Sequence, residues 1–532
     1  MVVDSLASVL FDEEVFIEGL LSIPARAGGI IPFRKSNFQN YYLEQRRTGK
    51  KRRVILKPRQ IFASTIILAK NFQDCVTQPG TRVLVMTHNE DATRLMRLTV
   101  RQWTQQLEAL GLLPTIENDN DALLSFKNTN SFMVFLTAGG KMGARSTAFN
   151  RVHLSEVAHY EGNPETMLQG LIPAVPQDGQ IDIESTPRGA AGPFHAYYTD
   201  AKGEDVDWNA IFWPWYNNPE YMRDVPDRFR LDDKERFVQG QYKLSDRQMA
   251  WRQWMEAELK RAARDSGQSG NLFLQEYPED DISCFIAGVE GVLDSTVLQE
   301  MISFIQPPIT RFEQWDIWKG PRNGVPYIIG ADSSEGKSDY SAAHILDAIS
   351  LESVARFHMR VAPSEFSKAL DVGGKMYNDA LMVVETPGPG QVVLDRLQLQ
   401  FNYNPLYYYE DEIDGRTKDE PGWPQNSKTR NILIDTLQSM TSARGYRIYD
   451  ERTLRELASL TWRRVGSMRR ARAEAAAGSH DDLVFALGLG LVAAPSALRQ
   501  HRVKMGHSGP RVQIIGQSRY EAEARIQKAG WV

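Results

Sequence analysis

The stretch VILKPRQIFASTIILAKNFQDCV, residues 54–76, combines the pieces from which an α/β fold is built. VILK is a short apolar strand, PRQIFAST has the composition of a turn, and IILAKNFQDCV is an apolar helical run. Further apolar strands follow as RVLVMTH, SFMVFLTA, RVHLSEVA and GQIDIEST, with a long amphipathic helix at 90–110. Strands that alternate with helices are typical of a mostly parallel sheet. We therefore predict an α/β domain over residues 51–215.

A second α/β pattern begins at Tyr327. The strands YIIGAD, SAAHILDA and LESVARFHMR come first, and the chain then alternates between helices at 364–379 and 391–399 and the strands LMVVE and LYYYE. A long apolar helix over 481–494 closes the pattern. This order predicts a separate α/β domain over residues 321–495.

Three segments lie outside these two domains. Residues 1–50 look helical and then loop-like. Residues 216–320 belong to a stretch rich in Trp, Tyr and charge, including DWNAIFWPWYNNPEY, which indicates helices that bridge two domains. Four prolines ahead of the second pattern place the domain boundary near 305–325. Residues 496–532 predict a flexible basic tail, because the last ~35 residues hold seven Lys or Arg and two Glu without periodicity.

Length and composition limit the class of protein. A chain of 532 residues is too long for one core, and 42% apolar with 24% charged residues is ordinary for a soluble protein. The net charge of −5 excludes a basic balance over the whole chain. Any contact with nucleic acid must therefore come from local patches.

Cysteine usage and apolar segments bear on the compartment. Only Cys75 and Cys284 are present, which excludes a disulfide framework and a zinc site built on cysteine pairs. The first residues, MVVDSLASVLFDEEV, carry acids and no basic region, unlike a signal peptide. The longest apolar run, 483–494, is shorter than the ~18 residues that a membrane-spanning helix needs. We expect a cytoplasmic protein in a reducing compartment, with no membrane partner.

The turn after the first strand stands where an α/β sheet places a phosphate loop, because a helix N-terminus offers free N–H groups to an anion. The pattern GxxxxGK[ST] is absent, and the turn contains no glycine. An ordinary basic turn is therefore the alternative. The residues that could contact ATP here are Lys57, Arg59 and Gln60, followed by Ser64 and Thr65, of which a hydroxyl could ligate Mg²⁺.

Later segments favour the phosphate loop. RVHLSEVAHY is a strand that ends at Glu156, and a carboxylate at that point can hold Mg²⁺ or activate the attacking water. The acid that usually precedes it is Ser155 here, so a metal would depend on Ser64 or Thr65 and on water. IDIESTPRG ends a strand with Ser185 and Thr186, a polar pair that could sense the γ-phosphate.

An arginine could complete this chemistry. Arg145 comes eleven residues before Glu156 and could stabilise transition-state charge, in its own or a neighbouring subunit. A surface or DNA-facing arginine is the alternative.

A set of acids marks the second domain. Asp332 ends the strand YIIGAD, Glu385 ends LMVVE, and Asp481 and Asp482 open the last helix. Carboxylates that converge repel one another unless a cation lies between them, and hard oxygen ligands suit Mg²⁺ or Mn²⁺. Two such ions about 3.5–4 Å apart can cut a phosphodiester. Taken singly, each acid has a plain alternative as a turn, loop or helix-capping residue.

Further residues could assist these acids. Asp339 and His480 are second candidates at the metal site. Five arginines just before the last helix could steer DNA from a loop or hairpin, or form a solvated charged turn. These arginines are Arg463, Arg464, Arg469, Arg470 and Arg472.

KPRQIFAST, LSEVAHY and ESTPRG, in this order, resemble the large terminase subunit of tailed bacteriophages, the DNA-packaging ATPase-nuclease. The resemblance covers roughly residues 30–495 and extends to the three acidic segments of the second domain. It implies a P-loop ATPase domain joined to an RNase H-like nuclease domain. Lys57 would be a Walker A lysine displaced to the start of its loop, and Gln39 would contact adenine. This chain departs from the family at Phe62, where a glycine is usual, and in reducing the acidic pair to Glu156.

The same resemblance implies a role and partners. ATP hydrolysis would drive double-stranded DNA into a capsid, and a two-metal site of Asp332, Glu385, Asp481 and Asp482 would cut concatemeric DNA to start and end packaging. Lys428 would face the DNA backbone. ATP and Mg²⁺ or Mn²⁺ would be the cofactors, with viral DNA, a portal protein and a small terminase subunit as partners. A ring, expected to have five subunits, would work in the host cytoplasm at the portal vertex of the procapsid.

Two other functions stay open from the residues. One is a helicase-nuclease or a transposition-type ATPase, although the sequence lacks helicase motifs and a sequence-specific DNA-binding module. The other is a DNA-binding scaffold that has lost hydrolysis, which the missing loop glycine and Ser155 keep open.

Overall fold

The computed structural model divides into two compact units, Met1–Val289 and Glu290–Val532. The residues that it describes are 9–25, 28–139, 148–190, 192–202, 207–263, 272–286, 291–337, 339–410, 417, 419–464, 471–475 and 480–504.

An eight-stranded sheet forms the centre of unit 1. Its first six strands are parallel, and the last two extend it with antiparallel pairing. The strand β3, which leads into the predicted phosphate loop and is called the loop strand, lies between β10 and β9. The strand β9 separates it from β8. The strands in spatial order are β10 (Trp208–Phe212), β3 (Arg52–Leu56), β9 (Gln180–Ser185), β8 (Arg151–Ser155), β4 (Arg82–Thr87), β7 (Ser131–Thr137), β6 (Leu123–Phe126) and β5 (Ile116–Asp119).

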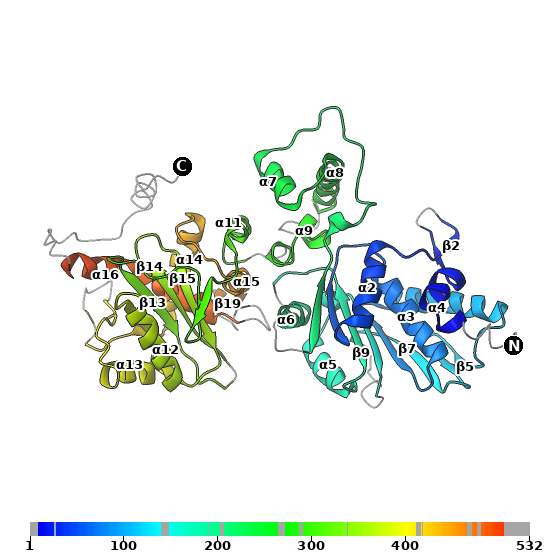
Figure 1. Ribbon diagram of the computed structural model, residues 1–532, viewed down its shortest axis with the longest axis horizontal. Coiled ribbons are helices and arrows are strands. Elements are labelled where there is room, and N and C mark those ends of the chain that lie inside the picture. The colour runs from blue at the N-terminus through cyan, green and yellow to red at the C-terminus, as the bar shows by residue number, and fades with distance from the viewer. Residues whose placement is uncertain are drawn as a thin grey trace. The chain divides into compact units, whose positions relative to one another are not determined.

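Helices cover both faces of this sheet (Figure 1). Apolar side chains of the helix after the loop, such as Ile66, Ile67 and Phe72, are fully buried, which holds that helix against the strands. One face carries α2 (Asn37–Thr48), α3 (Ala63–Thr77) and α4 (Glu90–Ala109), and the other carries α5 (Pro164–Leu171) and α6 (Gly192–Ala201). Smaller elements are η1 (Val15–Leu20), β1 (Ser22–Pro24), β2 (Ile30–Pro32), η3 (Val157–His159), η4 (Ile172–Ala174) and η5 (Trp215–Asn217).

The aromatic stretch around residue 215 differs from the prediction of bridging helices. Residues Trp208–Phe212 form β10, an edge strand parallel to β3, because their backbone completes the hydrogen bonding of that edge. The ring of Trp251 stacks on Trp215 at 5.0 Å and on Tyr221 at 4.6 Å, which ties the following helices to the core of unit 1. Those helices are α7 (Asp233–Tyr242), α8 (Asp246–Ala263), α9 (Leu272–Glu276) and α10 (Ser283–Ile286).

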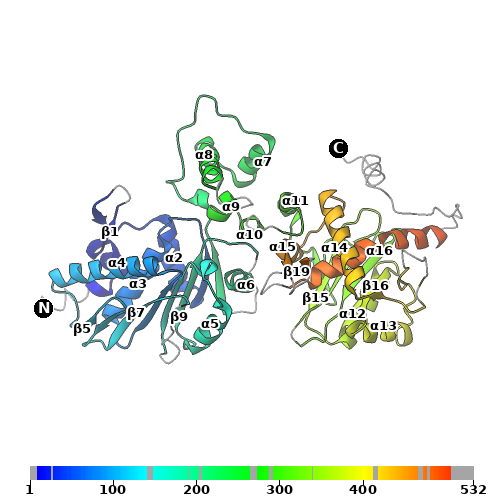
Figure 2. The same ribbon diagram turned by 180° about the vertical axis from the view of Figure 1, so that it is seen from behind.

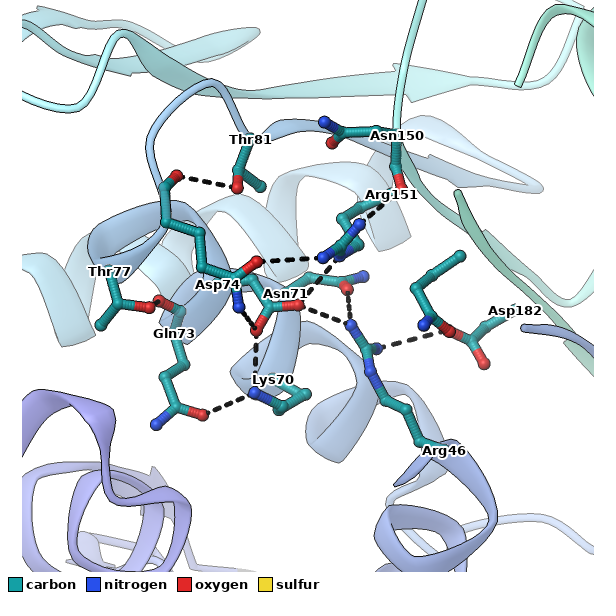
Figure 3. Close-up of polar contacts among 12 residues, drawn as sticks. Arg46, Lys70, Asn71, Gln73, Asp74, Thr77, Thr81, Asn150, Arg151 and Asp182 are labelled. Carbon is teal, nitrogen blue, oxygen red and sulfur yellow. Dashed lines mark hydrogen bonds and ion pairs between the residues drawn. The ribbon is translucent and has the colours of Figure 1, made fainter. Parts of the chain in front are cut away.

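A buried ion network joins four elements near the amino ends of these parallel strands (Figure 3). Arg46 of α2 contacts Asp74 of α3 at 2.9 Å and Asp182 of β9 at 3.5 Å, and Arg151 of β8 contacts Asp74 at 2.9 Å. Burial would raise the pKa of Asp74, but Arg46 and Lys70 outweigh it and lower the pKa to about 2. The network therefore consists of permanent charges at neutral pH.

A seven-stranded sheet forms the centre of unit 2. The strand β13 is parallel to β16 and antiparallel to β14, and β14 is antiparallel to β15. Five of its strands lie in the spatial order β15-β14-β13-β16-β17. Numbered along the chain from β13 as strand 1, this order is 3-2-1-4-5. The full spatial order is β11 (Thr310–Phe312), β12 (Trp315–Ile317), β15 (Ser353–Met359), β14 (Ser341–Asp347), β13 (Tyr327–Asp332), β16 (Leu381–Thr386) and β17 (Trp423–Pro424).

Helices again lie on both faces (Figures 1 and 2). One face carries α12 (Pro363–Met376) and α13 (Pro389–Leu399), and the other carries α14 (Ser427–Ser442) and α16 (Asp482–Lys504). Unit 2 also contains α11 (Ser295–Met301), η6 (Ile302–Phe304), α15 (Glu451–Ser459) and the antiparallel hairpin of β18 (Leu460–Arg464) and β19 (Ala471–Ala475).

The helix α16 packs backbone to backbone on β13. A Cβ at Gly330 would lie 2.1 Å from the carbonyl oxygen of Ala486 and 2.4 Å from the nitrogen of Gly490, so only glycine permits this approach. By length and composition, residues 482–503 are the one helix in the described chain that could cross a membrane, but 67% of that window is buried inside the protein. Much of α16 is therefore enclosed by the rest of unit 2.

Three boundaries differ from the predictions. The units divide at 289/290 instead of 305–325, because Gly291 forms a bridge with Thr461 and α11 packs on α14 and α15. Residues 496–504 continue α16 instead of starting a flexible tail, with Ala497 buried, and residues 505–532 lie outside the described residues. LYYYE forms isolated bridges, among them Leu406 with Met382, in place of a regular strand.

Candidate nucleotide and metal sites

The first site lies at the carboxyl ends of β3, β8 and β9 in unit 1. Lys57 follows β3 directly, and its Nζ lies 2.7 Å from Glu156 Oε1 and 3.2 Å from Glu184 Oε2. The lysine and Glu184 are both buried. Burial opposes the charge on Lys57, but the two carboxylates outweigh it and raise its pKa. The loop lysine is therefore charged at neutral pH.

Glu156 stands at the end of β8 in a strained conformation. Its φ of 58° and ψ of 47° are left-handed values that a non-glycine residue adopts at a cost. Ser185 Oγ and the Thr186 backbone nitrogen both donate to Glu156 Oε2 over 3.2 Å. The structure thus brings together the predicted base and the predicted sensing pair.

Of the two loop hydroxyls, Ser64 joins this cluster, whereas Thr65 is half-buried in the first turn of α3. Ser64 Oγ donates to Glu184 Oε1 over 2.6 Å and lies 3.4 Å from Ser155 Oγ. Glu184 was not predicted, because in IDIES it looks like the polar member of an alternating strand. Its place one residue before Ser185 was the only available signal.

The loop between β3 and α3 bends where glycine is usual in the resembling family. Phe62 and Gln60 both have a φ of 57°, a conformation that glycine adopts more readily. Gln39, on α2, donates through Nε2 to the carbonyl oxygen of Phe62 over 3.0 Å, so it lies beside the loop. The exposed Arg59 side chain lies 2.5 Å from Glu276 on α9.

Two histidines and an arginine complete the surroundings. His159 Nε2 lies 3.0 Å from Thr186 Oγ1, and burial lowers the pKa of His159, although Glu156 opposes this. His153 Nε2 lies 3.3 Å from Glu184 Oε1. The predicted Arg145 lies outside the described residues, and the exposed Arg188 of the TPRG turn is close enough to affect His159 electrostatically.

This arrangement offers a cation, a hydroxyl and carboxylates at the start of a helix. A lysine and backbone N–H groups there can hold phosphates, and Ser64 is a ligand that Mg²⁺ accepts. Glu156 lies at the strand tip from which a base can act on water. The set therefore suits a nucleoside triphosphate with its metal.

The second site lies at the ends of β13 and β16 and the start of α16 in unit 2. Ala331 pairs with Val384 across the two parallel strands, so the residues that follow, Asp332 and Glu385, are neighbours. Burial raises the pKa of Asp332 well above its ordinary value, as do the charges of Glu385, Asp482 and Asp481. The four predicted acids therefore lie within electrostatic reach of one another.

The same repulsion affects the other acids. Burial raises the pKa of Glu385, with Asp481 adding to it and Arg430 opposing it. Burial, together with Asp481 and Asp339, raises the pKa of Asp482 to about 7. Carboxylates that resist ionisation in this way are stabilised by a cation.

The carboxylate oxygens of these four acids are ligands that suit a divalent cation. Asp482 Oδ2 is buried and accepts no hydrogen bond, which leaves a carboxylate oxygen for a metal. Within the described chain, no three His, Cys, Asp or Glu side chains already stand close enough together to hold an ion.

Arg430 of α14 is a site residue that the sequence analysis missed in favour of Lys428. Its Nη2 donates to Asp481 Oδ2 and to the carbonyl oxygen of Ala473, over 3.3 and 3.2 Å, and its guanidinium lies 4.1 Å from the ring of Phe485. Lys428, two positions earlier, is exposed at the first turn of the helix. Arg430, and not Lys428, therefore contacts the acids in the described residues.

Two arginines and two histidines surround Tyr340, next to the acids. Arg360 and Arg452 lie 4.5 and 4.9 Å from its ring, and His358 stacks on it at 4.2 Å. His480 meets the same ring edge-on at 5.4 Å, and its Nδ1 lies 3.8 Å from Asp482 Oδ2. In the described part of unit 2, neither Arg360 nor Arg452 forms an ion pair. These guanidiniums can accept an anionic ligand.

The predicted arginine segment is a hairpin. Arg463 and Arg464 lie in β18, and Arg472 lies in β19 with its Nε 3.4 Å from Glu474 Oε1. Arg469 and Arg470 lie outside the described residues.

The two sheets define the fold class. Unit 1 is a mostly parallel P-loop ATPase fold with β9 between the loop strand and the glutamate strand, and unit 2 is an RNase H-like fold with acids on its first and fourth strands. The predicted fold class is confirmed. No family model matches the sequence, and no curated protein matches it.

Among the solved structures that resemble this chain are large terminase proteins. The HK97 bacteriophage large terminase matches 91% of this chain and 99% of its own, with a TM-score of 0.44 and 15% identity. The magnesium-bound large terminase nuclease from thermophilic phage G20c matches 37% and 96%, with a TM-score of 0.31 and 22% identity. The ATPase domain of the Thermus phage P74-26 large terminase matches 46% of this chain and 93% of its own, with a TM-score of 0.32 and 13% identity. At these scores, the chemistry of this chain is inferred from its own residues.

Proposed function

We propose that this protein is a viral DNA-packaging motor with two activities. Unit 1 hydrolyses ATP to move double-stranded DNA into a capsid, and unit 2 cuts concatemeric DNA with divalent metal at the start and end of packaging. The observation that carries the proposal is that each unit gathers, at the carboxyl ends of its strands, residues from distant segments. Lys57 meets Glu156 in unit 1, and Asp332 meets Glu385 in unit 2.

In unit 1, Lys57, Arg59, Gln60 and the first turn of α3 would hold the phosphates, with Gln39 toward the base. Glu156 would take a proton from the attacking water, and Ser185 with Thr186 would orient that carboxylate according to the nucleotide state. A bound Mg²⁺ would neutralise the phosphate charge. These roles are supported by the contacts of Glu156 with Lys57 and Thr186.

In unit 2, Asp332, Glu385, Asp481 and Asp482 would hold the divalent cations, which would activate water and stabilise the leaving oxygen. Similar nuclease structures hold magnesium, cobalt or zinc, which supports a divalent ion here. DNA phosphates would contact Lys428, Arg360, Arg452 and the arginines of the β18–β19 hairpin, since a motor for any sequence must grip the backbone.

The proposed partners are viral DNA, a portal protein and a small terminase subunit. The working form would be a ring of five subunits at the portal vertex of a procapsid in the host cytoplasm. The support is the resemblance of the motifs to large terminases.

An ATPase assay on the full chain tests unit 1. We expect DNA-stimulated hydrolysis that Glu156→Gln lowers by roughly 10²–10⁴-fold, while nucleotide binding persists. Equal, near-zero rates in wild type and variant would instead indicate a scaffold that does not hydrolyse ATP.

Plasmid cleavage with Mn²⁺ tests unit 2. We expect Asp332→Ala to abolish cleavage and to leave ATP turnover unchanged. Undiminished cleavage by this variant would refute the nuclease assignment. Asp435→Ala on α14, which removes an acid that no part of the proposed site uses, is the matched control.

A further inference from the structure

The acid that usually precedes the catalytic glutamate is absent from β8, where Ser155 stands. We propose that Glu184 of the neighbouring strand β9 takes its place, as the carboxylate that anchors the metal-binding hydroxyl of Ser64. This inference rests on the proposed ATPase function of unit 1 and deepens it. It replaces the expectation that a metal would depend on Ser64 or Thr65 and water alone.

The sheet order explains how an acid on β9 can do this. In the parallel register, Glu184 lies level with Ile55 of β3 on one side and with Ser155 of β8 on the other. The strand β9 is the direct neighbour of the loop strand, whereas β8 is one strand further away. A glutamate on β9 therefore reaches the loop from a position closer than that of β8.

The contacts match the role. In P-loop ATPases, Mg²⁺ is held by the loop Ser or Thr together with an acid at the end of a nearby strand. Here Ser64 Oγ donates to Glu184 Oε1 over 2.6 Å, and Ser155 Oγ lies 3.4 Å from the same hydroxyl. Glu184 thus contacts the same hydroxyl that the side chain at position 155 approaches.

Burial argues against a purely structural glutamate. The side chain of Glu184 is 0% exposed, and an apolar residue at such a position would avoid the cost of burying a carboxylate. Asp182, two residues earlier on the same face, is held by Arg53 and Arg46, which remain buried side chains of the core. Two of the partners of Glu184, Lys57 and Ser64, are instead residues that a nucleotide with its metal would engage.

His153 gives Glu184 a partner that no nucleotide would remove. Its Nε2 lies 3.3 Å from Glu184 Oε1, on the adjacent strand β8 and fully buried. When Lys57 turns to the phosphates, His153 would keep the carboxylate directed at Ser64. His153 is thus a positioning residue in this scheme.

The test removes the carboxylate from β9 and then restores one on β8. Bound Mn²⁺ would be counted by electron paramagnetic resonance on the full chain with a non-hydrolysable ATP analogue, in Glu184→Gln and in the double variant Glu184→Gln/Ser155→Asp. Asp332→Ala would be present throughout, to weaken the second metal site. We expect Glu184→Gln to weaken Mn²⁺ binding with nucleotide by roughly 10- to 100-fold. The double variant should recover most of that loss, because it restores a carboxylate beside Ser64.

Controls separate the possible failures. Glu108→Gln, which removes an exposed carboxylate at the end of α4, should leave Mn²⁺ binding unchanged. Thermal unfolding identifies any variant that fails to fold, in which case Glu184→Asp replaces Glu184→Gln and should weaken binding less. Wild-type-like Mn²⁺ binding in Glu184→Gln, or no recovery in the double variant, would overturn the inference alone. A wild-type chain that binds no Mn²⁺ with nucleotide would overturn the proposed ATPase as well.

Discussion

Lys57 Nζ donates to Glu156 Oε1 over 2.7 Å, although the two residues stand 99 positions apart in the chain. The same ammonium group neutralises Glu184, so two carboxylates in this cluster depend on one cation. Removing the cation would leave a buried negative charge without compensation.

Lys57→Met should therefore lower the free energy of unfolding of unit 1 by about 3–5 kcal/mol at neutral pH. Lys57 lowers the pKa of Glu184, against the effect of burial, so this stability exists above the ordinary glutamate pKa and is lost as the pH falls below it. Urea unfolding followed by fluorescence at pH 7.5 and near pH 4 measures the difference, which should shrink at the lower pH. Lys51→Met, at an exposed position, should cost no more than about 0.5 kcal/mol. Equal costs for the two variants would contradict the prediction.

Metal should stabilise unit 2 more strongly as the pH rises. Burial and neighbouring acids raise the pKa values of Asp332 and Asp482, the latter to about 7. Between the unfolded and folded pKa values, the folded chain holds more protons, so without metal its stability falls as the pH rises. Mn²⁺ binds the ionised form, and we expect the thermal shift that it produces to be larger at pH 8 than at pH 6.

Asp482→Asn provides the comparison for this pH effect. The variant lacks the group with a pKa of about 7, so its Mn²⁺-induced shift should be smaller and should depend less on pH. A shift in wild type that is the same at both pH values would argue against a metal site built from these acids.

Arg430 should set the pH at which cleavage becomes active. Its charge opposes the raised pKa values of Asp332 and Glu385. Arg430→Met should displace the pH–rate profile of Mn²⁺-dependent cleavage upward by about 1 unit. Lys428→Met, at the exposed start of the same helix, should weaken DNA binding without moving the profile. A reversed pattern would assign the electrostatic role to Lys428 instead.

Arg360 and Arg452 should contact DNA phosphates. Both guanidiniums lie on the ring of Tyr340 within 5 Å, close to the acids. Each variant, Arg360→Ala or Arg452→Ala, should reduce the slope of log affinity against log salt for duplex DNA by about 0.9. Fluorescence anisotropy at several salt concentrations measures this slope. Arg311→Ala removes an equally charged but distant arginine on β11 and should leave it unchanged.

The sequence allowed most of the strands to be predicted, because parallel strands covered on both faces are continuous apolar runs. The segments VILK, RVLVMT, YIIGAD and LMVV were identified in this way. The strand β10 escaped because Trp208–Phe212 lies at an edge and is only partly buried, so it lacks that pattern.

The acids of unit 2 could be predicted because each stands at the end of an apolar run. Glu184 could not, since the alternation in IDIES is typical of a strand with one face in water. Both Asp182 and Glu184 are buried, and the cations that permit this, Arg53 and Lys57, belong to another segment. Whether an acid is buried depends on partner residues from distant segments, and a single sequence does not show which segments become neighbours in the fold. Arg430 was missed for the same reason, since nothing in its own segment points to Asp481.

The ion network of Figure 3 fastens the amino ends of β8 and β9 to α2 and α3, whereas Lys57, Glu156 and Thr186 stand at the opposite ends of the strands. Because the amino ends are held by these ion pairs, we expect a ligand to displace the loop and the start of α3 more than the residues of the network.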